Sequence, residues 1–522
     1  MSLLPMSSAI RSLAFCSLIL FATTATATDD PVSPKPDGKD GTPEKTDALA
    51  PAAAVTHHRL IINGKTIAYT ATAATIDLKN NAGDAIGRMF YVAYTADGAG
   101  ADHRPVTFCF NGGPGSSSLW LHMASFGPVR TEVSDAQPTP PPPYTVTDNP
   151  ESLLDQTDLI FVDAMGTGFS RILSKGKGED FYGTDADIAA FGQFIQRWVN
   201  ASGRWNSPKF LLGESYGTTR ASGLLAYLND KGMSFNGSVM VSSYLNAWTD
   251  FNGPPFANDL AYELYLPTIA ATAWYHGRLD PKPAQLDAFL DEVRTFALGE
   301  YAAALARGNK LGDVEREAVL AKLHRYTAMP EDFLRQANLR IDPSRFGKEL
   351  LRGNRRTIGR LDARFVGIDH DAAGEFPESD AADDAFAAAF TASLNHYVRD
   401  NLHYTTDDLY RPTNYDEVGK DWKLSHGSDN GEAPMPDVAE DLRKAMSANP
   451  GLKVFFANGY YDFATPFFET EYTVAHMGLD PALEKNLSWG YYPSGHMIYI
   501  NPASRQQMKA DLARFYQSAT TR

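Results

Sequence analysis

The stretch that most constrains this chain is the pentapeptide Gly-Glu-Ser-Tyr-Gly at residues 213–217. An apolar run at residues 209–212 precedes it, and a segment with helical character, residues 218–229, follows it. The pattern predicts a strand, a sharp turn and a helix, with Ser215 at the apex of the turn. The alternative is a strand–helix turn that holds a serine by chance. A catalytic serine requires that the rest of the chain supply a base, an orienting acid and an oxyanion hole.

Composition and charge narrow the class of protein. The chain has 522 residues, of which 43% are hydrophobic and 21% charged, as in an ordinary globular protein with one large α/β domain or two average ones. Its formal net charge of −16 argues against nucleic acid or an anionic membrane surface as a partner.

The N-terminus has the pattern of a secretory signal peptide over residues 1–27. Arg11 precedes an apolar run at residues 13–21, and the small residues that end at Ala27 offer a cleavage site. The apolar run is too short to span a bilayer, so we expect export to the periplasm or the medium without a stable membrane anchor.

Cleavage would remove Cys16 and leave Cys109 as the one cysteine, which excludes an intramolecular disulfide. An exported chain without disulfides favours a bacterial envelope protein. Residues 28–56 are rich in Pro, Ala, Asp and Lys and predict a flexible spacer, with ordered structure expected from about His58.

A glycine-rich loop is expected to supply backbone donors. Residues 106–110 form a nearly all-apolar run, typical of a strand that is buried on both faces, and Asn-Gly-Gly-Pro-Gly-Ser-Ser-Ser follows at residues 111–118. Neither dinucleotide nor P-loop spacing is present. We therefore expect an oxyanion hole made by the backbone amides of Gly113 and Tyr216; a loop that is tight only for packing is the alternative.

The order of the strand-like and helical patterns predicts an α/β-hydrolase fold: a central, mostly parallel sheet flanked by helices, with an inserted helical cap. An Asn-Gly hairpin at residues 60–69 opens the sheet. The expected core covers residues 57–253 and 450–522. Between them, residues 254–449 show helical patterns almost throughout and predict the cap.

Three residues follow predicted strands in the chain order that this fold requires: Ser215, Asp462 and His496. A serine hydroxyl needs a base to take its proton, and a carboxylate fixes the tautomer of that base. Asp163 also ends a predicted strand and is a rival for Asp462, although it precedes the serine. This chemistry requires neither a metal nor a cofactor.

Four motifs together resemble those of the serine carboxypeptidases, α/β-hydrolases that remove C-terminal residues from peptides. They are Asn-Gly-Gly-Pro-Gly-Ser-Ser-Ser at residues 111–118, Gly-Glu-Ser-Tyr-Gly at residues 213–217, Asn-Gly-Tyr-Tyr-Asp462 and Gly-His496. The resemblance implies that Ser215 is the nucleophile, His496 the base and Asp462 its orienting acid. It also implies that Asn111 and Glu214 bind the terminal carboxylate of the substrate.

Two departures from the family pattern leave the residue preference open. Ser116 stands where many members have a cysteine, and Tyr244-Leu245-Asn246 replaces a frequent Gly-Asn-Gly.

The expected function is that of a serine-type carboxypeptidase acting on peptides with a free C-terminus, as a monomer or homodimer. Glu214 can donate to a carboxylate only when protonated, so the activity is expected to favour acidic pH. The alternatives are an esterase or acyltransferase on the same scaffold, or a catalytically silent binding protein.

Overall fold

The structure is a computed structural model that describes residues 47, 49–98, 100, 103–251, 258–428 and 431–521. The expected signal peptide with Cys16, residues 28–46 and 48 of the expected spacer, and the expected start of the cap at residue 254 lie outside the described residues.

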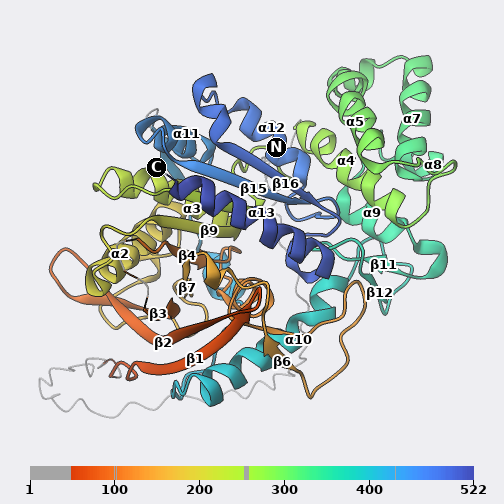
Figure 1. Cartoon of the computed structure of the whole chain (residues 1–522). Helices are drawn as coiled ribbons and strands as arrows, with labels where there is room; N and C mark the ends of the chain where they lie inside the picture. Colours follow the sequence, from red (N-terminus) through yellow and green to blue (C-terminus); the bar gives the residue numbers. More distant parts are fainter. Residues whose placement is uncertain are drawn as a thin grey trace, which may run out of the picture. The chain divides into compact units, whose positions relative to one another are not determined.

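One ten-stranded sheet forms the core, in the order β1-β2-β3-β7-β4-β9-β10-β15-β16, with β8 paired to β3 (Figure 1). The strands from β7 to β16 in that order run parallel, and the first three join them through antiparallel pairings. The bounds are β1 Ala54–Ile62, β2 Lys65–Lys79, β3 Ala85–Ala96, β4 Val106–Phe110, β7 Asp158–Val162, β8 Arg171–Ile172, β9 Lys209–Ser215, β10 Gly237–Ser243, β15 Lys453–Gly459 and β16 Leu487–Tyr492.

Helices cover both faces of this sheet. Every residue of β4 and β7 is buried, which explains why these central strands are apolar without alternation. One face packs against α1 (Leu119–Ala124), α10 (Ala381–His396) and α13 (Pro502–Thr520). The other packs against α2 (Thr184–Ser202), α3 (Tyr216–Asn229), α11 (Ala439–Ala448) and α12 (Phe467–His476). A parallel sheet covered in this way, with a strand–serine–helix turn, is the α/β-hydrolase fold that the sequence predicts.

The expected N-terminal boundary of the ordered chain is wrong by a few residues. Strand β1 begins at Ala54, inside the expected spacer, and Ala54 pairs with Ala73 of β2. The reason is that β2 continues to Lys79 and offers backbone partners well beyond the Asn-Gly hairpin. No helix among the described residues is long and apolar enough to cross a membrane.

Between β10 and β15 the chain is mostly helical, and we call its described part, residues 258–428 and 431–449, the cap. The helices α4 to α9 share one apolar cluster and are drawn in green and teal in Figure 1. Their bounds are α4 Leu260–Tyr275, α5 Leu286–Phe296, α6 Ala302–Arg307, α7 Asp313–Thr327, α8 Glu331–Gln336 and α9 Pro343–Glu349.

The cap also contains strands that the sequence did not indicate. These are the two-residue pair β11 (Thr357–Ile358) and β12 (Val366–Gly367), and the pair β13 (His426–Ser428) and β14 (Gly431–Ala433). Strands this short carry no readable alternation of polar and apolar residues. A third small pair, β5 (Val129–Thr131) with β6 (Val146–Asp148), lies before the elbow.

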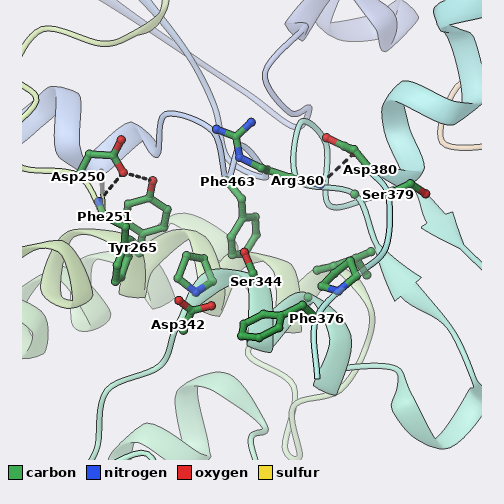
Figure 2. A pocket seen from close by; sticks show the side chains of 15 residues that line it. Asp250, Phe251, Tyr265, Asp342, Ser344, Arg360, Phe376, Ser379, Asp380 and Phe463 are labelled. Carbon is green, nitrogen blue, oxygen red and sulfur yellow. Dashed lines mark hydrogen bonds between the residues drawn. The ribbon is translucent and has the colours of Figure 1, made fainter. Parts of the chain in front are cut away.

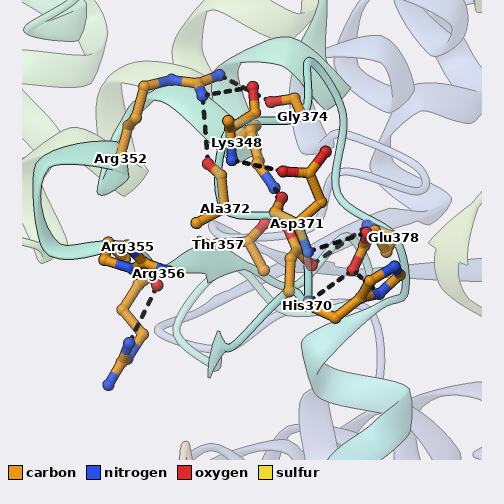
Figure 3. A network of polar contacts seen from close by, with 12 residues as sticks. Lys348, Arg352, Arg355, Arg356, Thr357, His370, Asp371, Ala372, Gly374 and Glu378 are labelled. Carbon is orange, nitrogen blue, oxygen red and sulfur yellow. Dashed lines mark hydrogen bonds and ion pairs between the residues drawn. The ribbon is translucent and has the colours of Figure 1, made fainter.

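A polar network fixes the loop after β12 to α9. Lys348 donates to the carboxylate of Asp369 and, over 2.8 Å, to the carbonyl of Asp371 (Figure 3). Both side chains of the Lys348–Asp369 pair are almost fully buried, with 3% and 4% of their surfaces exposed. This pair therefore lies wholly inside the cap.

Candidate active site

Ser215 lies at the turn between β9 and α3. It is the last residue of the strand, and the helix begins at Tyr216. Its backbone has φ 60° and ψ −133°, which is a strained conformation for a residue with a side chain. Strain of this kind persists where the surrounding structure imposes it, and it is typical of functional sites.

The loop after β4 lies directly against the start of α3. A Cβ atom on Gly112 would lie 2.4 Å from the backbone nitrogen of Tyr216, so only glycine allows this approach. Gly112 and Gly113 line the same cavity as Ser215. The two backbone amides predicted to form the oxyanion hole, those of Gly113 and Tyr216, therefore belong to segments in direct contact.

A buried arginine that no sequence motif indicates forms a hydrogen bond to this loop. Arg220 on α3 donates from Nη1 to the carbonyl of Asn111 over 2.7 Å and from Nε to Asp187 on α2 over 2.7 Å. Its guanidinium lies 4.2 Å from the ring centroid of Phe191. Because α2 and α3 both hold Arg220, the position of Asn111 depends on the packing of these two helices.

Asp462 and His496 meet at the carboxyl ends of neighbouring parallel strands, β15 and β16. The distance between His496 Nδ1 and Asp462 Oδ2 is 2.8 Å. The backbone amides of Ala464 and Thr465 donate to the other carboxylate oxygen. The carboxylate is thus fixed in place and orients the imidazole by its Nδ1 edge, which leaves Nε2 for proton transfer.

The rival residue, Asp163, serves a different purpose. Its Oδ1 accepts hydrogen bonds from the backbone and hydroxyl of Ser118 and from the hydroxyl of Tyr410. It therefore ties the start of α1 to the segment after α10. Local sequence could not separate Asp163 from Asp462, because both follow buried strands and only the strand order decides which one lies next to β16.

Asn111 and Glu214 form a buried pair beside the nucleophile. Asn111 Nδ2 donates to Glu214 Oε1 over 2.7 Å, while Asn111 Oδ1 accepts from the backbone amide of Leu121. Glu214 Oε2 is buried and has no hydrogen-bond partner among the described residues, although the hydroxyl of Tyr499 lies nearby. A buried carboxyl oxygen left in this way is well suited to carry a proton.

Burial raises the pKa of Glu214 to about 7; the charge of His496, the nearby hydroxyl of Tyr499 and the hydrogen bond from Asn111 offset only part of this effect. Burial alone would lower the pKa of His496, but the charge and hydrogen bond of Asp462, together with the charge of Glu214, outweigh it and the pKa is raised. Arg360 opposes this rise. The charge of each group thus favours the charged form of the other.

Ser215, His496, Asn111, Gly113 and Glu214 all line one cavity of about 490 Å³. Trp120, Asp383 and Tyr415 contribute further walls. Burial raises the pKa of Asp383 to about 6. The candidate residues that the sequence predicts as separate motifs thus line one cavity, apart from Asp462, which contacts His496, and Tyr216, which follows Ser215 in the chain.

A second cavity of about 450 Å³ adjoins the first (Figure 2). Arg360 and Asp380 line both cavities. Its lining includes the aromatic side chains of Phe251, Tyr265, Phe376 and Phe463. No cluster of His, Cys, Asp and Glu that could hold a metal ion occurs within the described part of the chain.

A comparison with known proteins gives a family and a fold that the chain resembles. Residues 77–285 match the family model described as serine carboxypeptidase. Over these residues, the chain is similar to the serine carboxypeptidase family. The matched segment contains both the glycine-rich loop at Asn111 and the elbow at Ser215, the two motifs that first indicated the resemblance.

Two known proteins are similar to this chain. Serine-type carboxypeptidase F of Aspergillus niger is 30% identical over 129 residues, a match that spans 24% of this chain and only 22% of that protein. The crystal structure of Kex1ΔP, a prohormone-processing carboxypeptidase from Saccharomyces cerevisiae, superposes with a TM-score of 0.52 over 86% of this chain and 91% of that one, at 17% identity. At this level of identity, the likeness to Kex1ΔP concerns the fold alone.

Proposed function

We propose that this protein is a serine-type carboxypeptidase that releases C-terminal amino acids from peptides through an acyl-enzyme. The observation that carries the proposal is the buried Asn111–Glu214 pair, which lines the same cavity as Ser215 and His496. An ester without a free carboxylate would have no use for this pair. A peptide that ends in a carboxylate would receive hydrogen bonds from Asn111 and from protonated Glu214.

In the proposed reaction the Ser215 hydroxyl oxygen attacks the carbonyl carbon of the last peptide bond, and its proton passes to His496. Asp462 stabilises the imidazolium that forms. The amides of Gly113 and Tyr216 hold the developing oxyanion, each contributing about 3 kcal/mol to its stabilisation. His496 then protonates the leaving amino acid. Water then gives a proton to His496 and attacks the acyl carbon; the bond to the Ser215 oxygen breaks, His496 returns the proton to that oxygen, and the shortened peptide leaves as a carboxylic acid.

The proton on Glu214 sets the pH range. Acylation needs neutral His496, whereas carboxylate binding needs protonated Glu214. The productive enzyme therefore has one proton on Glu214 and none to spare on His496. The alternative state, with a Glu214 carboxylate and a His496 imidazolium, carries the same number of protons, so the two states exchange without a change in total charge. A substrate carboxylate beside Glu214 raises the pKa of Glu214 further and so selects the productive form. Activity on free acids should fall as the pH rises through about 7, the pKa of Glu214. It should also fall at low pH, where His496 becomes protonated.

The direct test is digestion of an N-blocked peptide that ends either in a free acid or in an amide. We expect sequential release of single C-terminal amino acids from the free acid, detected by mass spectrometry, and at least about tenfold slower turnover of the amide, since a lost charge-assisted hydrogen bond costs roughly 1.5–3 kcal/mol. Equal rates on both peptides, or turnover of simple esters alone, would favour the esterase alternative.

We also propose that the protein is exported, which rests on the sequence of residues 1–27. N-terminal sequencing of the protein from its native source should give a chain that starts at Thr28. A chain that retains the apolar segment would contradict cleavage.

A further inference from the structure

A short segment of the cap, residues 360–364, connects β11 to β12 and lies between the loops that carry Asp462 and His496. The acyl-transfer chemistry proposed above does not use it, and its sequence, Arg-Leu-Asp-Ala-Arg, matches no motif that indicated function. It nevertheless forms backbone hydrogen bonds to both of these loops.

Backbone hydrogen bonds attach the segment to both loops. On the Asp462 side, the amide of Phe463 donates to the carbonyl of Arg360 over 3.0 Å, and the amide of Ala363 donates to the carbonyl of Tyr461 over 3.0 Å. On the other side, the amide of His496 itself donates to the carbonyl of Leu361 over 2.6 Å.

A cap carboxylate holds the start of this segment. Asp380, just before α10, accepts hydrogen bonds from the amides of Arg360 and Leu361 over 3.0 and 2.8 Å. Figure 2 shows Arg360 between Asp380 and Phe463. The segment is therefore fixed on the side of the cap as well as on the side of the sheet.

A buried ion pair extends these contacts to the residues just before His496. Arg364 pairs with Asp362 over 2.6 Å, with 3% and 5% of their side-chain surfaces exposed. Arg364 also donates to the hydroxyl of Ser494 over 3.2 Å, and Asp362 accepts from the amide of Gly495. A Cβ on Gly495 would lie 2.4 Å from the carbonyl oxygen of Leu361, so the His496 loop lies directly on the segment.

We propose that residues 360–364 are a positioning element that holds the Asp462 and His496 loops in catalytic register, with Asp362 and Arg364 as its buried side-chain pair. The proposal rests on the proposed roles of Ser215, Asp462 and His496. A base must stay within about 0.5 Å of its productive position, and an error of about 1 Å costs roughly 100-fold in rate. The cap is then part of the catalytic apparatus as well as a wall of the cavity.

Three variants and one matched control test the proposal. Asp362→Asn removes the charge with little change of shape, Arg364→Lys keeps the charge but loses the planar fork, and Ser494→Ala removes one acceptor on the His496 loop. The control is Asp369→Asn, which breaks the equally buried Lys348–Asp369 pair elsewhere in the cap (Figure 3).

Two readouts are needed: kcat and KM on a free-acid peptide, and the rate at which a fluorophosphonate labels Ser215. For Asp362→Asn we expect kcat and the labelling rate to fall together by about 10- to 100-fold, with KM within about twofold of the wild type. Arg364→Lys should lie between this variant and the wild type. Ser494→Ala should fold normally and lose about threefold.

The control should lose thermal stability as Asp362→Asn does but keep wild-type kcat and labelling per folded molecule. The proposal is overturned if Asp362→Asn and Ser494→Ala keep wild-type rates, or if the control loses as much activity as Asp362→Asn. If the wild type is labelled but releases no amino acids, the carboxypeptidase proposal fails while the labelling rates still decide the positioning role. A wild-type Ser215 that resists labelling overturns both.

Discussion

The sheet brings Ser215, Asp462 and His496 together through parallel strands that end at one edge, whereas the cap reaches the same place through one short segment, residues 360–364. In the sheet, each candidate catalytic residue either ends its own strand, as Ser215 does, or follows it within a few positions. In the cap, the segment touches residues about 100 to 135 positions away in sequence, and nothing in its local pattern indicates the contact.

The positions of the residues therefore depend on different structural features in the two regions. The sheet-edge residues are fixed by strand register, because β15 pairs with β16 from Val454 to Gly459. The cap contacts depend on how the inserted helices pack. We therefore expect substitutions in the core to act on chemistry first, and those in the cap away from residues 360–364 to act on stability alone.

The largest expected effect is the loss of the nucleophile. Ser215→Ala should lower kcat by about 10⁴-fold or more and abolish fluorophosphonate labelling, because removal of a triad nucleophile typically costs this much. Ser222→Ala on the following helix α3, where the buried hydroxyl has no partner among the described residues, is the matched control and should remain active. Undiminished labelling of the Ser215 variant would place the nucleophile elsewhere.

Two equally buried ion pairs, one in the core and one in the cap, allow the effects of the two regions on stability and on catalysis to be compared. Asp187→Asn in the core and Asp369→Asn in the cap should each cost about 3 kcal/mol of unfolding free energy, measured by urea denaturation, because each leaves a buried cation unpaired. Only the core variant should also lower kcat, by about tenfold, since Arg220 then holds the Asn111 carbonyl less firmly. If the two variants lowered kcat equally, the core pair would not differ from the cap pair in its effect on catalysis, and the prediction would be wrong.

The smallest effect is expected where the two regions meet. His426 of β13 in the cap contacts Asp185 of α2 over 2.6 Å and Asp441 of α11 over 2.7 Å. Burial alone would lower the pKa of His426, but these carboxylates raise it to about 10.

Because the pKa of His426 is higher in the folded protein than in the unfolded chain, charged His426 stabilises the fold. This stabilisation is complete below the pKa of the unfolded chain, about 6.5, and is lost as the pH rises through the folded pKa of about 10. His426→Gln should therefore be less stable than the wild type by about 1–2 kcal/mol at pH 6, with a difference that narrows towards pH 10. Thermal unfolding across this range measures it, and a difference that does not change with pH would exclude a charged His426.

Much of the core could be predicted from local pattern because its signals lie within a few residues of one another. The apolar run of β4, the Asn-Gly hairpin and the turn at Ser215 all appear in the structure. Thr465, whose hydroxyl lies 2.9 Å from Asp462 Oδ2, was missed although it follows the acid by only three residues.

The rest could not be predicted, because it depends on contacts between distant segments. Arg220 is an unremarkable residue of a helix until α2 supplies Asp187, and Asp362 and Arg364 gain their significance only when β16 ends beside them. Likewise, the raised pKa of Glu214 results from burial, which the pentapeptide around Ser215 suggests but does not determine.

The measurement that most directly tests the central claim is the pH dependence of kcat/KM on a free-acid peptide for the wild type and Glu214→Gln. The amide donates at every pH and removes a charge that raises the pKa of His496. The decline above about pH 7 should therefore disappear and the acid limb should shift to lower pH. Asp383→Asn, another carboxyl of the cavity, should keep the alkaline decline. A Glu214→Gln profile that coincides with that of the wild type would contradict carboxylate recognition by a protonated Glu214.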